Sequence, residues 1–443
     1  MKRGLTLSLL LALCATSLNA SERNSLVAAQ AAANWIRAAA VPTAQGTAYL
    51  ADPNDKQSVA TNLYAGVPGV VLFFLEAYHS TGDAAYLKDA RSGADYLIAH
   101  LAEEKETGLY EGVAGIGFAL IETFKATRDD RYKQAAARVT RMLKEQARTV
   151  ELKPESRRVI SGVEWNDTTD IIAGAAGTGL FLLYAASELN DPSLKMLAAR
   201  AGRRLIATGK PEAGGLKWAM NKDFPRLMPN FSHGTAGVAY FLATLYGATR
   251  DRAFLDAALG GAHYLQAVAK TDGDICMVFH NEPDGRELYY LSWCHGPAGT
   301  ARLFYRLYEV TGDRRWMDWV KRSARAIMQS GIPERQTPGF WNNVSQCCGS
   351  AGVGEFFLSL YQVTGDKSYL EFTRRVTNNL LARATRERSG LKWVQAEHRV
   401  KPDLLVAQTG LMQGAAGIGL FLLHLDASER GKKPLVRFPD SPF

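Results

Sequence analysis

The stretch CHGPAGTARLFYRLY, residues 294–308, places a cysteine and a histidine before a Gly-x-x-Gly pair and follows the pair with an apolar run. The same frame returns six more times in the 443-residue chain, for example as CCGSAGVGEFFLSLY from Cys347. The first glycines of the seven units are Gly66, Gly112, Gly174, Gly234, Gly296, Gly349 and Gly414. Self-similarity at this spacing indicates a repeat architecture, and each unit is long enough for two helices and their loops.

Most units carry a polar break after the apolar run, such as STGD from Ser80 and TGDK from Thr364. Glycine and aspartate in such a break end one helix and cap the next. The following segment is amphipathic, as in AYLKDARSGADYLIAHL from Ala85, with apolar residues on one stripe and charges on the other. Each unit is therefore predicted to form a buried inner helix and a half-exposed outer helix.

The count of helices favours a closed ring. Six units have an outer helix after them, and the helical stretch from Ser25 can supply the seventh, packed beside the outer helix of the sixth unit. The predicted fold is an all-α toroid (α/α barrel) of seven inner and seven outer helices. An open solenoid is the alternative, but it would need polar caps at its ends, and the apolar seventh inner helix is a poor cap.

The first twenty residues are typical of a secretory signal peptide. Lys2 and Arg3 precede an apolar run from Leu5 to Leu13, and small and polar residues lead to Ala20. We expect residues 1–20 to be removed near Ala20, residues 21–443 to form one domain, and the protein to be exported to the periplasm or the outside of the cell. The apolar run is too short to span a membrane. A lipoprotein signal centred on Cys14 is the weaker alternative, because Leu13 stands where a small residue is wanted.

Composition excludes several classes of function. The chain is 47% hydrophobic and 22% charged, as globular proteins are. Without Lys2 and Arg3 the net charge falls from +8 to +6, and the remaining basic residues are scattered. We therefore expect no nucleic-acid surface and no stable membrane insertion.

Residues just before the glycines should face the middle of the ring, where helix N-termini gather partial positive charge. Cys294, Cys347 and Cys348 take these places in the adjacent fifth and sixth units. Three thiolates near helix N-termini suit Zn²⁺, and three protein ligands leave a fourth position open, as in catalytic zinc sites. His295 could replace one cysteine. A Cys347–Cys348 disulfide, a disulfide from Cys294 to either, or inert buried thiols are alternatives in an exported chain, and Cys276 lies outside the frame as a buried thiol.

The seven units, with WCHGPAG from Trp293 and CCGSAG from Cys347, closely resemble the lanthionine synthetase C-like family, which includes the lantibiotic cyclases. The resemblance covers nearly all of the chain after the predicted signal peptide. It implies a double-layered α/α toroid and a zinc ion that activates a cysteine thiol for attack on a dehydroamino acid. The implied zinc ligands are Cys294, Cys347 and Cys348, with His295 as a neighbour and not a ligand; the implied catalytic residues are His233, as acid or base, and Asp170.

Both catalytic residues also have a structural interpretation, and the resemblance is incomplete. His233 is one of eight histidines, although it stands directly before a glycine pair. Asp170 could simply cap the third inner helix. Tyr290 stands where a lantibiotic cyclase carries an active-site arginine, and neither Arg286 nor Arg302 is in register with it. A signal peptide is also unusual, because lantibiotic cyclases work in the cytoplasm.

The sequence thus predicts an exported zinc protein that adds a thiol to an α,β-unsaturated acceptor. The acceptor would be a peptide dehydroalanine or a small electrophile met by a thiol such as glutathione. One alternative is a carbohydrate-active enzyme on the same fold, which would need two carboxylates facing the cavity; Glu111, Asp167, Asp170 and Glu355 are available but form no compelling pair. A non-catalytic binding protein is the other alternative.

Overall fold

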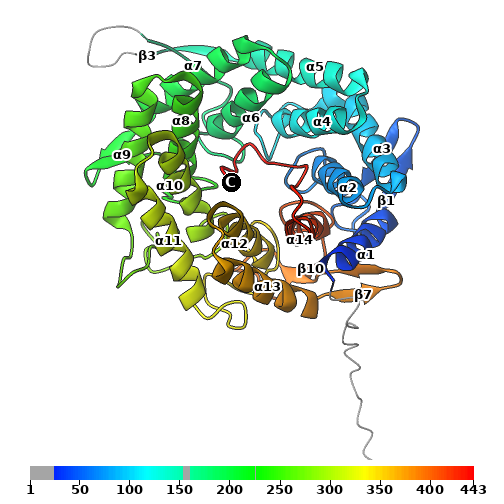
Figure 1. The fold of residues 1–443 in the computed structure, drawn as a ribbon. Helices are drawn as coiled ribbons and strands as arrows, with labels where there is room; N and C mark the ends of the chain where they lie inside the picture. The colour runs from blue at the N-terminus through cyan, green and yellow to red at the C-terminus, as the bar shows by residue number, and fades with distance from the viewer. Residues whose placement is uncertain (1–23, 153–159, 225) are drawn as a thin grey trace, which may run out of the picture.

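The computed structural model describes residues 24–152, 160–224 and 226–443, so the predicted signal peptide lies outside the described residues. The helices of these ranges form two concentric rings (Figure 1). The inner ring consists of α2 (Val67–Thr81), α4 (Val113–Thr127), α6 (Ala175–Glu188), α8 (Thr235–Thr249), α10 (Pro297–Thr311), α12 (Ser350–Thr364) and α14 (Ala415–Glu429). The outer ring consists of α3 (Ala84–His100), α5 (Asp130–Gln146), α7 (Pro192–Thr208), α9 (Arg252–Val268), α11 (Arg314–Gln329), α13 (Lys367–Ala382) and α1 (Ser25–Ala38).

Each inner helix packs against the outer helix that follows it in the chain, and α14 packs against α1. Neighbouring inner helices touch all the way round, including α14 and α2. Helix α1 fills the place between α13 and α3 (Figure 1), where Arg37 forms an ion pair of 2.6 Å with Asp89 of α3. The predicted toroid of seven inner and seven outer helices is confirmed.

The predicted helix caps are also present. Six outer helices begin after an aspartate whose side chain accepts a hydrogen bond from a backbone N–H in the first turn: Asp83, Asp129, Asp191, Asp251, Asp313 and Asp366. Inner helices α2, α10 and α12 end at glycines in the left-handed conformation. These polar breaks fix the tight turn between inner and outer helix.

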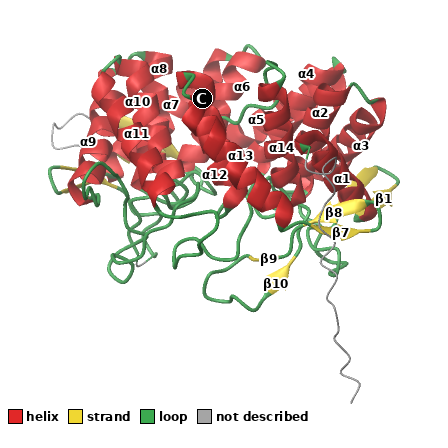
Figure 2. Cartoon of the chain, turned by 60° about the horizontal axis from the view of Figure 1, so that its bottom comes forward, coloured by secondary structure: helices red, strands yellow, loops and turns green. Residues whose placement is uncertain are grey.

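Five two-stranded antiparallel sheets were not predicted from the sequence. They pair β1 (Ala40–Thr43) with β2 (Gly46–Tyr49), β3 (Arg148–Leu152) with β4 (Ile160–Glu164), β5 (Lys210–Glu212) with β6 (Gly215–Lys217), β7 (Thr385–Glu387) with β8 (Gly390–Lys392), and β9 (Gln395–Ala396) with β10 (Leu405–Val406). Six of the ten strands have only two or three residues, which is too short to show an alternating pattern. Long loops gather on one face of the toroid, below the helices in Figure 2, and we call it the loop face.

The seven loops that lead into the inner helices are joined by a closed cycle of backbone hydrogen bonds, which we call the loop ring. Its members are the residues two places before the first glycine of each unit, except that in the third unit Ile172 accepts and the preceding residue, Ile171, donates. The bonds run Tyr64 N to Tyr110 O, Tyr110 N to Ile172 O, Ile171 N to Ser232 O, Ser232 N to Cys294 O, Cys294 N to Cys347 O, Cys347 N to Met412 O and Met412 N to Tyr64 O, at 2.8–3.2 Å. The last bond joins the seventh unit to the first and closes the toroid.

The second glycine of each unit is required by close packing of this ring. In six of the seven units, a Cβ atom there would lie 1.8–2.3 Å from the carbonyl oxygen of the residue six places earlier. The loop therefore folds back onto the start of its own helix. In six units a Cβ at this glycine would also meet a side chain of the preceding unit, as Leu109 does at Gly177 and Leu411 does at Gly69. The absence of a side chain at these glycines thus makes room both for the unit's own loop and for the neighbouring unit.

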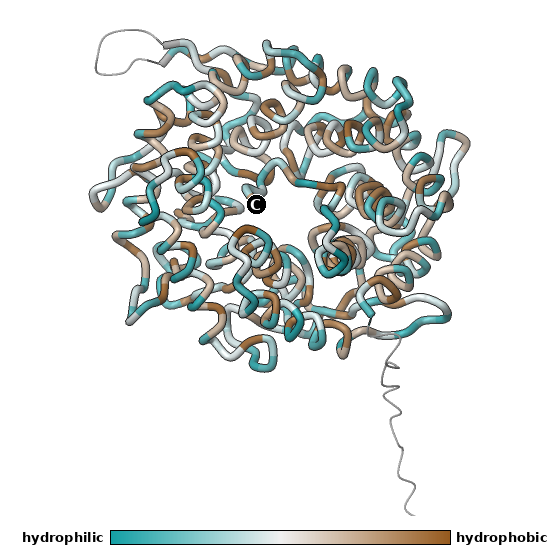
Figure 3. The backbone as a smooth tube through the Cα atoms, viewed as in Figure 1, coloured by the Kyte–Doolittle hydropathy of each residue, from teal (hydrophilic) through white to brown (hydrophobic). Residues whose placement is uncertain are grey.

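Inner helices are apolar over most of their surface because both the outer ring and their neighbours cover them. Hydrophobic colour accordingly concentrates in the inner ring of Figure 3, while the outer ring is mixed. In α14, every residue from Ala415 to Ala427 is buried. Across the described ranges, no helix combines the length and apolarity needed to cross a bilayer.

Replacing Gly177 by alanine should lower the free energy of unfolding by about 2 kcal/mol, because the new methyl group would overlap the Ile171 carbonyl oxygen. Gly247, in α8, is the matched control, since its Cβ would meet nothing closer than 3.4 Å. Gly247→Ala should be neutral or stabilising by up to about 1 kcal/mol. Urea denaturation followed by circular dichroism measures both; equal effects would contradict the close-packing explanation.

Candidate metal centre and proton-transfer pair

A cavity of about 480 Å³ opens on the loop face, and its floor is the loop ring. Five ring residues line it: Tyr64, Ile172, Ser232, Cys294 and Cys347. The residues that directly follow ring positions also line it: His233, His295, Cys348 and Gln413. The repeat therefore delivers side chains from consecutive units into one shared space.

The three cysteines of the fifth and sixth units converge in this cavity. Their Sγ atoms lie within 4.8 Å of one another, with Cys348 3.3 Å from Cys294 and 3.5 Å from Cys347. Zinc with bonds of about 2.3 Å to sulfur places tetrahedral sulfur ligands about 3.7 Å apart. The spacing and the soft donor set therefore fit a zinc ion. All four cysteines that the structure describes are free thiols, in contrast to the disulfide alternatives.

The three sulfur atoms share negative charge unequally. Burial by itself would raise the pKa of Cys294, but hydrogen bonds from the Cys347 and Cys348 thiols, and from Ser292, lower it well below its ordinary value. The Cys294 thiolate in turn raises the pKa values of Cys347 and Cys348. Cys294 is therefore the sulfur that ionises first. By contrast, burial raises the pKa of Cys276 to about 12, as expected of an inert thiol.

Tyr64 and Gln413 flank the cysteines, and the sequence reasoning missed both. Gln413 Nε2 donates to the Tyr64 hydroxyl at 3.0 Å and lies 3.9 Å from Cys348 Sγ. Burial, followed by the charges of Cys347 and Cys348, raises the pKa of Tyr64 well above 10.0. Their signal was the repeat frame, because Tyr64 takes the position of Cys294 and Gln413 that of Cys348.

His233 also lines the cavity, and its imidazole pairs with the buried carboxylate of Asp170. His233 Nδ1 lies 2.7 Å from Asp170 Oδ2. Asp170 Oδ1 accepts from the N–H groups of Ala173 and Gly174 at 2.9 Å each. Asp170 therefore holds the loop before α6 and also orients His233, so the two interpretations of this residue coexist. Its side chain is 1% exposed, while that of His233 is 31% exposed.

The pair changes the protonation of His233. Burial alone would lower the pKa of His233, but the hydrogen bond and charge of Asp170 raise it above its ordinary 6.5. Charges on Cys347 and Glu111 add to this effect. The arrangement favours a protonated imidazole that opens onto the cavity.

An aromatic wall, His280, Tyr290 and His295, lies beside Cys294. The ring centroids of His280 and His295 are 4.4 Å apart, and Tyr290 lies 4.4 Å from His280 and 5.2 Å from His295. Burial lowers the pKa of His280 to about 4 and that of His295 well below 6.5, so both rings are neutral. His295 is outside the cysteine group. His280 had no signal in the sequence because it lies outside the repeat frame.

The carboxylates proposed for carbohydrate chemistry are divided by the structure. Glu111 lies near Asp170, since burial and then the Asp170 charge raise its pKa. Glu355 lies against His424, at 2.8 Å, in a different cavity on the helix side of the loop ring. The candidate arginines are also engaged elsewhere, because Arg286 pairs with Glu282 and Arg302 with Asp440.

Residues 57–438 match the family profile described as "Lanthionine synthetase C-like protein". A curated relative, the Danio rerio protein named glutathione S-transferase LANCL1, is 26% identical over 140 residues, which are 31% of this chain and 32% of the relative. The match thus spans about a third of the relative's length.

Two solved structures show the same toroid at low sequence identity. Nisin cyclase superposes with a TM-score of 0.60 at 18% identity, over 83% of this chain and 89% of that one. A glycoside hydrolase family 76 mannosidase, Bt3792 from Bacteroides thetaiotaomicron, superposes with a TM-score of 0.52 at 12% identity, over 92% and 100%. These likenesses establish the fold alone.

Asp170→Asn should lower the pKa of His233 from above 6.5 to below it, because burial then acts without the opposing carboxylate. Histidine NMR titration of reduced, metal-free protein measures the change. His424 is an internal control, since Glu355 and Glu76 hold its pKa near 10. An unchanged His233 titration would show that Asp170 does not set its charge.

Proposed function

The chain belongs to the lanthionine synthetase C-like family, and we propose that it adds a thiol to an α,β-unsaturated acceptor at a zinc ion held by Cys294, Cys347 and Cys348. The observation that carries the proposal is the convergence of these three thiols within 4.8 Å in a cavity that is also lined by His233, whose imidazole is paired with Asp170 behind it. The relative named as a glutathione S-transferase supports a thiol as one substrate. The predicted signal peptide supports a site of action outside the cytoplasm.

Zinc bound by three thiolates would keep one coordination position for a substrate thiol and stabilise its thiolate form. The protein's own contribution is to present the three sulfurs together. The backbone bond from Cys294 N to Cys347 O, 3.1 Å, ties the two loops that carry them. Ser345 Oγ accepts from Cys348 N at 3.3 Å and fixes the third position.

His233 would handle the proton of the reaction. The substrate sulfur forms its new bond to the β-carbon of the acceptor, the carbon–carbon π electrons move towards the carbonyl, and His233 gives its proton to the α-carbon. The proton lost by the substrate thiol restores the protonated imidazole, so the net reaction is addition of S–H across the double bond. Asp170 stabilises the imidazolium and orients it through Nδ1, leaving Nε2 for the substrate.

In this protein the aromatic wall, through Tyr290, occupies the position at which a lantibiotic cyclase carries an active-site arginine. Tyr290 is 7% exposed, and burial, then the Cys294 charge, raises its pKa to about 12. It therefore stays a neutral phenol near the sulfur atoms. We propose that this wall excludes water from the acceptor and that charge stabilisation falls to His233.

Cys294→Ala should reduce bound zinc from about one equivalent per chain to well under half an equivalent, because one of the three cysteine ligands is lost. Cys276→Ala, which removes a buried thiol outside the cluster, should keep the full equivalent. Elemental analysis of protein purified from its native compartment gives the numbers. Wild-type protein without metal, or with a Cys347–Cys348 disulfide, would refute the metal site.

His233→Ala should keep the zinc and the fold while thiol addition falls on the order of a hundredfold, the usual effect of losing a general acid or base. The assay follows a thiol adding to a dehydroalanine peptide, with zinc measured on the same samples. Because the protonated ring is the donor, the wild-type rate should decline as pH rises through the raised pKa of His233. Loss of zinc in His233→Ala would make the histidine a ligand, and an unchanged rate would make it structural.

A further inference from the structure

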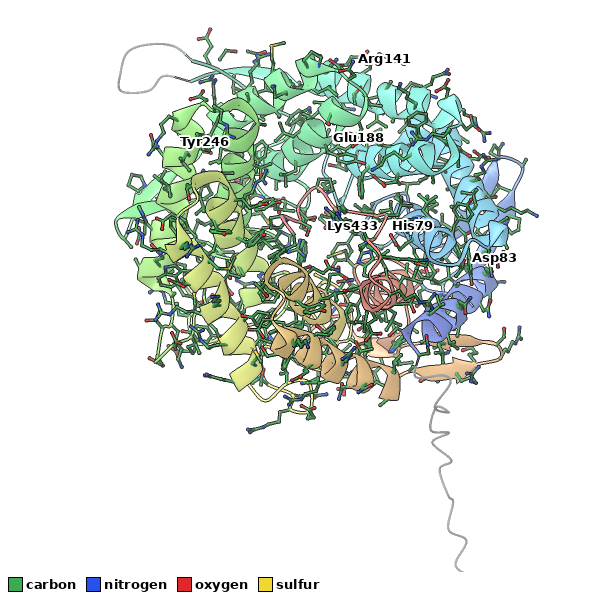
Figure 4. The ribbon with its side chains drawn as sticks, viewed as in Figure 1. His79, Asp83, Arg141, Glu188, Tyr246 and Lys433 are labelled. Atoms are coloured by element: carbon green, nitrogen blue, oxygen red, sulfur yellow. The ribbon has the colours of Figure 1, made fainter. Side chains whose placement is uncertain are left out.

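Residues 430–443, which we call the tail, follow α14 and run into the middle of the toroid (Figure 1). The tail is held along its length by inner helices. Lys433 O lies 3.2 Å from His79 Nε2 at the end of α2, and both residues are labelled near the centre of Figure 4. Further along, the N–H groups of Leu435 and Val436 donate to Glu76 Oε2 at 2.9 and 2.8 Å.

Near its end the tail carries a buried side-chain carboxylate. Asp440 is fully buried, and its Oδ1 accepts from the Tyr110 hydroxyl at 3.2 Å, while its Oδ2 accepts from Trp293 Nε1 at 3.3 Å. Arg302 supplies the counter-charge, 3.5 Å from Oδ2, and also donates to the Asp440 carbonyl oxygen at 3.0 Å. Phe438 and Phe443 flank it, against Phe118 and Tyr305.

Both donors to this carboxylate belong to the loop ring or adjoin it. Tyr110 is a ring residue, and Trp293 directly precedes Cys294. A cavity of about 80 Å³, lined by Tyr110, Trp293, Arg302 and Asp440, lies on the helix side of the ring. The loop that carries Cys294 is thus held in two ways: the loop ring bonds to its backbone, and the tail bonds to the side chain of Trp293, the residue before Cys294.

A carboxylate in this place is costly unless all its partners are kept. Its two oxygens take one donor each from the second and fifth units, which are not neighbours in the ring. An apolar tail residue would fill the same space but could not fix the indole of Trp293. The geometry therefore indicates that Asp440 orients the loop that carries Trp293 and Cys294, and does not merely fill the space beside it.

We propose that Asp440 is a positioning residue for the three-cysteine site: it holds the Trp293 indole, and through the peptide chain the sulfur of Cys294, against Cys347 and Cys348. Measuring zinc affinity as a test of this role rests on the proposed function, whereas measuring the reactivity of the Cys294 thiol does not. The tail is thereby a part of the site, although it lies on the opposite side of the loop ring from the cavity mouth.

The test compares Asp440→Asn with Glu122→Gln. Glu122 is an equally buried carboxylate, in α4, bonded to Lys125 and Tyr184. Metal-free, reduced proteins are treated with iodoacetamide, and mass spectrometry follows alkylation of Cys294. We expect about a tenfold faster reaction in Asp440→Asn, since loss of a charge-assisted hydrogen bond loosens the loop, and wild-type rates in Glu122→Gln. Zinc affinity, from chelator competition, should weaken about tenfold in Asp440→Asn alone.

Trp293→Phe removes the same hydrogen bond while leaving the sequence of the tail unchanged, and it tests the proposal if Asp440→Asn fails to fold. It should speed alkylation of Cys294 to a similar degree, and adding Asp440→Asn to it should have little further effect. The proposal would be overturned if the alkylation rate of Cys294 were unchanged in both single variants, or were changed equally by Glu122→Gln. The tail would then only fill the centre of the toroid. Wild-type protein that binds no zinc would refute the proposed function, while the alkylation comparison would still judge this inference.

Discussion

Everything else in this protein depends on the closed cycle of seven backbone hydrogen bonds between the loops before the inner helices. Unpaired backbone groups at the buried centre of a toroid would be expensive. The loop ring pairs them across every unit boundary, including the one between the seventh and the first. To reach each other, the loops must lie almost on the helix starts, and the carbonyl contacts at the second glycines follow from that approach.

The loop ring also explains why chemistry gathers where it does. Side chains at or just after the ring positions of six units line one cavity, so a unit can contribute a group without disturbing the helices. Tyr110, of the second unit, lines the cavity on the helix side instead. The fourth, fifth and sixth units place His233, Cys294 and the Cys347–Cys348 pair at these positions, and the third unit adds Asp170 from two residues before its ring position. Since chain order equals spatial order, Asp170, His233, Cys294 and the Cys347–Cys348 pair follow each other around the rim. The proton donor and the sulfur atoms are thereby set on neighbouring arcs.

The sequence carried most of the fold, because seven copies of one frame and six aspartate caps repeat a signal that would be weak once. It also indicated the cysteine group and His233, since all stand in that frame. It could not indicate His280 or the placement of Arg302, which depend on loops and a tail outside the repeat. The sequence offered a cap and a catalytic role for Asp170 as alternatives, but it could not show that both hold at once, because the two interactions use different oxygens of one carboxylate.

The division of the centre into two compartments is the remaining consequence. On the loop face the ring supports an open cavity with sulfur, imidazole and aromatic groups. On the helix side the Asp440 carboxylate of the tail meets Arg302 of α10. The tail's backbone N–H groups at Leu435 and Val436 meet Glu76 of α2, which also lies 3.8 Å from His424 of α14. These ion pairs are buried behind the ring and hold the tail, while His233 keeps a partly exposed side chain. The same seven-fold scaffold thus separates charges that stabilise the fold from charges available for reaction. Trp293 links the two sides, because its indole donates to Asp440 and the next residue in the chain is Cys294.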